Sequence, residues 1–166
     1  MTQPSLRERA MNEGLITAVA VGGFLIILGA VFGLTPGIPE KLIDFFSDFT
    51  VKNYEALFLP APAHPAQHLS VYAAVFNFMT GIGVLQIAIL ALRLFYRSPF
   101  RRISETIGNL IFWFGGAIVA QLLLLNGTLE GWFQFWTALI ILIGVSLVVR
   151  GIIHFSRAVY RHDRWW

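Results

Sequence analysis

Four long apolar runs with almost no charged residues dominate the hydrophobic pattern of the chain. They cover residues 14–34, 71–92, 104–125 and 132–153. A run of about 20 apolar residues is long enough for a helix to cross a bilayer, where a chain must satisfy its own backbone hydrogen bonds. The pattern predicts an all-α membrane protein, with residues 1–166 forming a single integral membrane domain that is a four-transmembrane-helix bundle.

The segment between the first and second runs, residues 35–69, follows another pattern. From about residue 39 to 57, helical spacing places apolar residues such as Leu42, Ile43 and Phe46 on one face and acidic residues such as Asp44 on the other. This spacing predicts an amphipathic helix that lies along the membrane surface after the first span. The prolines that follow, at positions 60, 62 and 65, favour an extended chain. This outer loop is the longest segment outside the spans, and we expect it to be a contact surface.

Small residues recur at helical spacing in the predicted spans and indicate where helices pack closely. In the first run Gly29 and Gly33 form a G-x-x-x-G pair, and we expect this face to pack within the chain. In the fourth run small residues recur every seven positions, which is typical of left-handed helix packing. The predicted helix-packing residues are Gly22, Gly29, Gly33, Gly81, Gly116, Thr137, Gly144 and Gly151.

The composition agrees with a membrane protein and narrows its chemistry. Hydrophobic residues make up 57% of the 166 positions and charged residues only 13%, whereas soluble domains have about 25% charged residues. The chain has no cysteine, which excludes disulfides, thiolate metal sites and thiol nucleophiles. The basic residues flank the apolar runs instead of forming a soluble basic face, so we expect no nucleic-acid partner.

The basic residues are distributed unequally between the two sides of the predicted bundle. All ten arginines fall on the side of the termini and of the turn between the second and third runs, whereas Lys41 and Lys52 fall on the other side. By the positive-inside rule this distribution predicts a multi-pass protein of the plasma (cytoplasmic) membrane with both termini cytoplasmic. The arginines at the inner ends would attract anionic lipid headgroups. This inner basic collar consists of Arg93, Arg97, Arg101, Arg102, Arg150, Arg157 and Arg161.

Few residues suggest chemistry. His64 and His68 lie four positions apart in the outer loop and are weak candidates for a metal site, because Pro65 interrupts a helix between them and two histidines alone are fewer ligands than zinc takes. We predict no metal, no cofactor and no catalytic residue. Arg150 lies about one turn from the inner boundary, and we interpret it as a positional anchor. A pairing partner at the same depth would be Glu105.

Four short spans with an amphipathic segment after the first resemble the outline of the DoxX-type small membrane proteins, some of which serve quinone-linked oxidoreductases. The resemblance covers the whole outline and assigns no residue. We predict a non-catalytic integral membrane subunit that stabilises or assembles a larger membrane complex, with other subunits or copies of itself as partners. A homo-oligomeric channel or transporter is one alternative. The other is a quinone-associated accessory subunit, which would have a hydrophobic cleft next to Trp113 or the inner arginines.

Overall fold

The computed structural model describes residues 6–54 and 56–162, and it describes the side chains of these residues except those of residues 6, 7, 9, 154 and 156–162. Helices make up most of the described chain, with one two-stranded hairpin among them. The elements in chain order are α1 (Leu6–Leu34), α2 (Ile38–Ser47), β1 (Phe49–Tyr54), β2 (Leu57–Pro62), the 3-10 turn η1 (Pro65–His68), α3 (Leu69–Phe95), α4 (Phe100–Val119), the π-helical turn η2 (Ala120–Leu124) and α5 (Leu129–His162).

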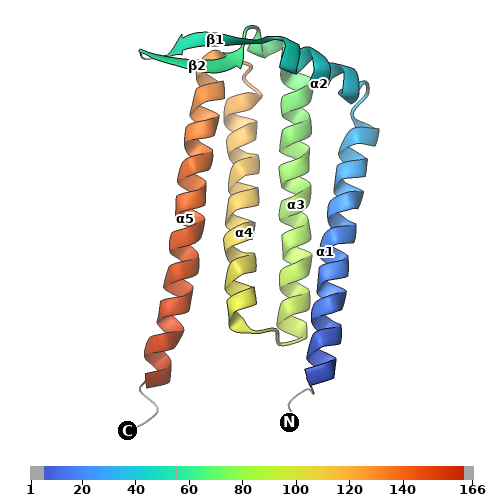
Figure 1. Ribbon diagram of the computed structural model, residues 1–166, viewed down its shortest axis with the longest axis vertical. Coiled ribbons are helices and arrows are strands. Elements are labelled where there is room, and N and C mark those ends of the chain that lie inside the picture. Colours follow the sequence, from blue (N-terminus) through green and yellow to red (C-terminus); the bar gives the residue numbers. More distant parts are fainter. Residues whose placement is uncertain (1–5, 55, 163–166) are drawn as a thin grey trace.

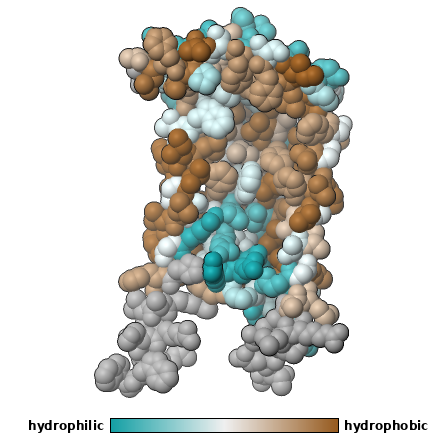
Figure 2. All heavy atoms as spheres, viewed as in Figure 1, coloured by the Kyte–Doolittle hydropathy of each residue, from teal (hydrophilic) through white to brown (hydrophobic). Residues whose placement is uncertain are grey.

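Four helical stretches are long and apolar enough to cross a membrane, which confirms that the four predicted apolar runs form helices of membrane-crossing length. They are Ala10–Leu34, Pro65–Phe95, Phe100–Leu124 and Leu129–Ile153. Figure 2 shows hydrophobic surface along most of their length and hydrophilic surface toward both ends, with a large hydrophilic patch nearer the end of the bundle where α1 begins and α5 ends.

The four long helices stand in one row, in chain order (Figure 1). α1 packs against α3, α3 against α4, and α4 against α5. We call the end where α1 begins and α5 ends the terminal end. At the opposite end α2 packs against α3 and β2 packs against α5, and together α2 and the hairpin (residues 38–54 and 56–62) cover the ends of the helices. We call these residues the lid.

The lid differs from the predicted amphipathic helix in length. The prediction of a helix to about residue 57 was wrong, because α2 ends at Ser47, where the backbone N–H of Asp48 bonds the carbonyl of Asp44. The residues that follow, including β-branched Thr50 and Val51, favour a strand. They pair antiparallel with residues 57–62, so Thr50 lies opposite Ala61. The chain is therefore mostly helical and not all-α.

The buried face of α2 also differs from the predicted one. Ile38 and Phe45 are 2% and 7% exposed, whereas Ile43 and Phe46, which were predicted to share the apolar face, are 67% and 68% exposed. Ile38, Leu42 and Phe45 are spaced four and three residues apart and pack together in the core. This spacing also keeps one face of a helix together, so the pattern allowed two faces, and contact with α3 selected this one.

Only part of the predicted helix-packing set contacts another helix. A Cβ atom at Gly81 would lie 2.8 Å from Ile27, and one at Gly116 would lie 3.0 Å from Met79, so these two glycines are at close helix contacts. At the other five predicted glycines a Cβ would meet no described part of the chain within 4 Å: Gly22, Gly29, Gly33, Gly144 and Gly151. Thr137 is exposed and bonds the carbonyl of Phe133, one turn earlier in α5.

The expectation that the first run packs within the chain through its G-x-x-x-G face was therefore wrong. α1 and α5 lie at the two ends of the row (Figure 1), so each turns one face to a neighbouring helix and leaves its other faces uncovered. α1 meets α3 at Gly23, where a Cβ would touch Leu85, and not at the adjacent Gly22. Successive residues of a helix point about 100° apart around its axis, so Gly22 points away from α3 when Gly23 faces it.

Candidate functional site

An apolar pocket of about 670 Å³ lies beneath the lid. The lid supplies five of its lining residues: Phe45 and Phe46 from α2, Phe49 from β1, and Leu59 and Pro60 from β2. Ligand sites in proteins are commonly clefts of about 300–1,000 Å³ with mainly hydrophobic and aromatic walls. The pocket has the size and the lining of such a site.

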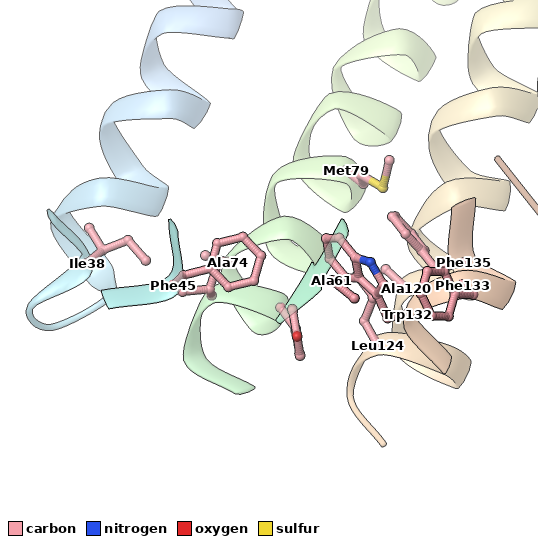
Figure 3. Close-up of a cluster of buried hydrophobic side chains, with 13 residues drawn as sticks. Ile38, Phe45, Ala61, Ala74, Met79, Ala120, Leu124, Trp132, Phe133 and Phe135 are labelled. Carbon is pink, nitrogen blue, oxygen red and sulfur yellow. The ribbon is translucent and has the colours of Figure 1, made fainter. Parts of the chain in front are cut away.

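The opposite walls come from three other elements. α3 contributes Val71, Tyr72, Val75 and Met79, and the π-helical turn η2 contributes Leu124. Spacings of four, three and one place the α3 residues on neighbouring positions of one helix face. Figure 3 shows Met79 and Phe45 among the buried side chains of this region, which come from different elements. A ligand chain that enters the pocket can therefore reach about two helical turns into the bundle, from Val71 to Met79.

α5 closes the pocket with its aromatic first turns. Its lining residues are Trp132, Phe133, Phe135, Trp136 and Leu139. Trp132, Phe133 and Phe135 are buried, whereas Trp136 is 49% exposed. Exposed Phe46 and Trp136 therefore mark where the pocket meets the surroundings of the bundle.

Edge-to-face aromatic contacts hold the walls in place. The ring of Phe45 lies 5.0 Å from Phe49, 6.0 Å from Tyr72 and 5.8 Å from Trp132, measured between centroids, and these pairs are steeply inclined. Such pairs contribute about 0.5–1.5 kcal/mol each beyond the area that they bury. The indole N–H of Trp132 also donates to the carbonyl of Pro60 across 3.4 Å, which joins α5 to β2.

Two glycines allow close approach near the pocket: Gly127 lets the turn after η2 approach η1, and Gly131 lets α5 approach η2. Gly127 has a φ of +62°, a left-handed conformation that favours glycine, and a Cβ there would lie 2.9 Å from Cα of Ala66. A Cβ at Gly131 would overlap the carbonyl of Leu123 in the π-helical turn. π-Helical turns are often found at functional sites, and η2 places Leu124 in the pocket wall. The sequence pattern did not predict η2.

The hydroxyl group of Tyr72 is the unusual polar atom of the pocket walls. Tyr72 is 2% exposed, and its hydroxyl oxygen is buried without a hydrogen-bond partner in the part of the chain that the structure describes. Burying a hydroxyl group without a partner costs about 1–3 kcal/mol. Sequence reasoning did not single out Tyr72, because nothing in a lone tyrosine near a helix start distinguishes it from an interfacial anchor.

His64 and His68 both bond the carboxylate of Asp48, which lies between α2 and β1. His64 Nδ1 and His68 Nε2 donate to the two oxygens of Asp48 across 2.8 and 2.9 Å, and the backbone N–H of His64 also donates to Asp48. The hydrogen bond from the His64 side chain is the largest cause that lowers the pKa of Asp48 well below its ordinary value of 3.8, followed by the bonds from the His64 backbone N–H and from His68. The two histidine side chains are 63% and 7% exposed.

These contacts are those of an anchor for the lid. No group of three or more histidine, aspartate and glutamate side chains among the described residues is arranged to hold a metal ion. The two imidazoles face separate oxygens of Asp48, and each nitrogen that donates must carry a proton and so is not free to bind a metal. The described geometry thus assigns His64 and His68 to Asp48.

The inner basic collar lies at the terminal end, away from the pocket. Arg93 Nη1 donates to the carbonyl of Arg102 across 2.6 Å, and Arg101 pairs with Glu105 across 3.1 Å. The first contact joins the end of α3 to the start of α4, and the second lies within α4. Arg97 also lies in this turn. The side chains of Arg157 and Arg161 are outside the described residues.

Arg150 has a different partner from the one expected. Its Nη2 donates across 2.6 Å to Oδ1 of Asn109, whereas the expected partner Glu105 pairs with Arg101. Its side chain lies over Gly108, where a Cβ would overlap it. Asn109 lies one turn nearer the lid than Glu105, which indicates that the side chain of Arg150 reaches into the bundle instead of toward the terminal end.

The pocket lies at the lid end and Trp113 does not line it, so it is not the cleft that the quinone-associated alternative called for. Comparison with protein-family models, curated proteins and solved structures gives no match. The fold and the site thus define a helical protein with four membrane-length helices in a row and an aromatic pocket under a lid at one end.

Proposed function

We propose that the protein is a non-catalytic membrane protein that holds the hydrocarbon chain of a membrane lipid in the pocket beneath its lid. The pocket itself carries this proposal: about 670 Å³ with walls formed by aliphatic and aromatic side chains. Each CH₂ group that leaves water for such a site gains about 0.8 kcal/mol. A polar substrate would gain nothing from walls of this kind.

The mouth of the pocket fits entry from the lipid. Phe46 on α2 and Trp136 on α5 are exposed at the pocket, and α5 is one of the helices that are apolar enough to cross a bilayer. A lipid chain could pass between them without crossing a charged surface. The protein would lie in the plasma membrane with the lid outside, because all ten arginines belong to the terminal-end side in the sequence and the two lysines belong to the lid.

Trp132 offers a direct test of chain binding, since it lines the pocket and is only 8% exposed. A variant that keeps Trp132 as its one tryptophan is reconstituted with phospholipids that carry bromine on their acyl chains. Bromine quenches indole fluorescence on contact, so strong quenching of Trp132 is expected. Val75→Phe, which fills the pocket, should relieve this quenching.

Val84→Phe is the matched control, because Val84 lies on the same helix and is 55% exposed to the surroundings of the bundle. It should leave the quenching of Trp132 unchanged. An unquenched Trp132, or equal quenching in the Val75→Phe and Val84→Phe variants, would contradict lipid binding in the pocket.

The complex subunit predicted from the sequence remains a second candidate, which the uncovered glycines of α1 favour. Gly29 and Gly33 face open space in the described chain, and a G-x-x-x-G pair lets a helix of another protein approach. Gly29→Leu should weaken co-purification of any partner, whereas Val21→Leu, at an exposed position on the same helix, should not. Native mass spectrometry would distinguish a complex with a foreign subunit from a homo-oligomer. A homo-oligomer would favour the alternative of a channel or transporter.

A further inference from the structure

A small polar pocket of about 120 Å³ lies beside the apolar pocket. Its polar lining side chains are Lys41 and Asp44 from α2, Gln67 and His68 from η1, and Ser70 from the start of α3. The site thus combines a cation, an anion and neutral hydrogen-bonding groups in one small space.

The two charges of this polar pocket are not neutralised by each other. Lys41 Nζ donates to the hydroxyl oxygen of Ser70 across 3.2 Å. The ion pairs found among the described residues involve His64, His68 and Arg101, so neither Lys41 nor Asp44 forms one there. An ammonium group and a carboxylate in one pocket without a charged partner are both available to a ligand that carries both signs of charge.

The two pockets are neighbours. Val71 lines both of them. His68 lines the polar pocket, and its ring packs edge-to-face on Phe45, a wall of the apolar pocket, with 5.2 Å between centroids. Because Asp48 also fixes His68, the wall between the pockets is held in place. A ligand with a polar head and an apolar chain can occupy both by lying over Val71.

We infer that the lipid held by this protein is a phospholipid with a primary-amine head, of the phosphoethanolamine class. The inference rests on the proposed function, in which the chain of the same lipid occupies the apolar pocket. The phosphate would accept hydrogen bonds from Lys41, Ser70 and Gln67. The bond from Lys41 would be the strongest of the three, because its ammonium group is charged. The terminal ammonium would donate to Asp44.

Charge decides among head groups. The head of phosphatidylglycerol ends in a neutral glycerol. It would leave the carboxylate of Asp44 without a cation and with the negative phosphate nearby. A choline head has no N–H group and cannot donate a hydrogen bond to Asp44. The ethanolamine head supplies both the anion for Lys41 and the donor for Asp44.

The test titrates delipidated protein in detergent with phosphatidylethanolamine, phosphatidylcholine and phosphatidylglycerol of identical acyl chains, and native mass spectrometry measures the bound fraction. The wild type should bind phosphatidylethanolamine about tenfold more tightly than the other two lipids. Asp44→Asn should abolish this preference. Lys41→Gln should weaken binding of all three lipids about tenfold, and Lys41→Arg should restore most of it.

Glu40→Gln and Lys52→Gln are the matched controls, because each removes the same type of charge from the lid at a residue that does not line the polar pocket. Both should retain the wild-type preference. The inference fails if the wild type shows no preference, or if Glu40→Gln removes the preference as Asp44→Asn does. Loss of binding in Val75→Phe without any head-group preference would contradict the inference alone, whereas binding that Val75→Phe leaves intact would contradict the proposed function.

Discussion

Asp48 accepts a hydrogen bond from Nε2 of His68 across 2.9 Å, and this bond joins the lid to the start of α3. His68 is 7% exposed, and its ring also packs against Phe45. His64 bonds the same carboxylate but is 63% exposed. The lid is therefore fixed to the bundle chiefly from the buried side, next to the pocket.

Replacing the two histidines should give unequal losses of stability. His68→Ala removes a buried ring and its hydrogen bond, so we expect the free energy of unfolding to fall by about 2 kcal/mol. His64→Ala removes a largely solvated contact and should cost less than about 1 kcal/mol. Denaturation in mixed micelles, followed by tryptophan fluorescence, measures both. Equal losses of unfolding free energy in the two variants would show that burial does not determine how much each histidine contributes.

The pH dependence of the anchor follows from the lowered pKa of Asp48. Because the folded pKa lies below the ordinary 3.8, the stabilisation is fully present above pH 3.8 and is lost as the pH falls toward the folded pKa. Asp48→Asn should therefore lower the melting temperature at pH 6, and the difference from wild type should shrink below pH 3.8. A difference that stays constant from pH 6 to pH 3 would contradict this assignment.

The four spans could be predicted because hydrophobic length alone identifies a membrane-length helix, whatever its neighbours are. The faces of those helices could not be predicted in the same way. Gly22 and Gly23 are adjacent, and only the position of α3 decides that Gly23 is the one in contact. The G-x-x-x-G pair at Gly29 and Gly33 predicted a packing face within the chain, but the row of helices leaves that face uncovered in the described chain.

The candidate site was only partly foreseen. Sequence reasoning predicted a contact surface in the outer loop and singled out His64 and His68 there, but it did not place Asp48 between them, as the structure does. It did not find the pocket, because the pocket forms only where the hairpin brings Pro60 against Trp132, 72 positions later in the chain. Long-range pairing of this kind leaves no local periodic signal.

Adding a methyl group should have opposite effects at two glycines. At Gly108 the new Cβ would overlap the side chain of Arg150, so Gly108→Ala should destabilise the protein by about 1–3 kcal/mol. At Gly144 the Cβ would meet nothing within 4 Å in the described chain, so Gly144→Ala should be neutral or stabilise the helix by up to about 1 kcal/mol. Melting temperatures in detergent compare them. A large loss in Gly144→Ala would indicate that another chain packs there.

Removing the hydroxyl group of Tyr72 should not destabilise the lipid-free protein. Since that oxygen is buried without a partner among the described residues, Tyr72→Phe should raise the free energy of unfolding by about 1 kcal/mol. Tyr96→Phe, in the turn after α3, should change it by less than about 0.5 kcal/mol. Both are measured after delipidation. A loss of stability in Tyr72→Phe would show that the hydroxyl group has a partner in the native protein.

The bond between Arg150 and Asn109 predicts strong coupling between two helices. Asn109→Leu leaves the buried guanidinium without its acceptor, so we expect a loss of about 2 kcal/mol. Arg150 Nε already lacks a partner among the described residues, and replacing a buried polar pair by apolar side chains is often neutral. The double variant Asn109→Leu/Arg150→Met should therefore recover most of the loss.

A double-mutant cycle in mixed micelles measures this coupling, and an exposed pair on one helix gives its reference. Gln134 donates to Glu130 across 2.7 Å on the surface of α5, and such pairs contribute about 0.2–0.5 kcal/mol. The coupling between Asn109 and Arg150 should exceed this value severalfold, because both groups are partly buried between α4 and α5. A coupling no larger than that of the exposed pair would return Arg150 to the role of a positional anchor whose guanidinium is solvated at the terminal end.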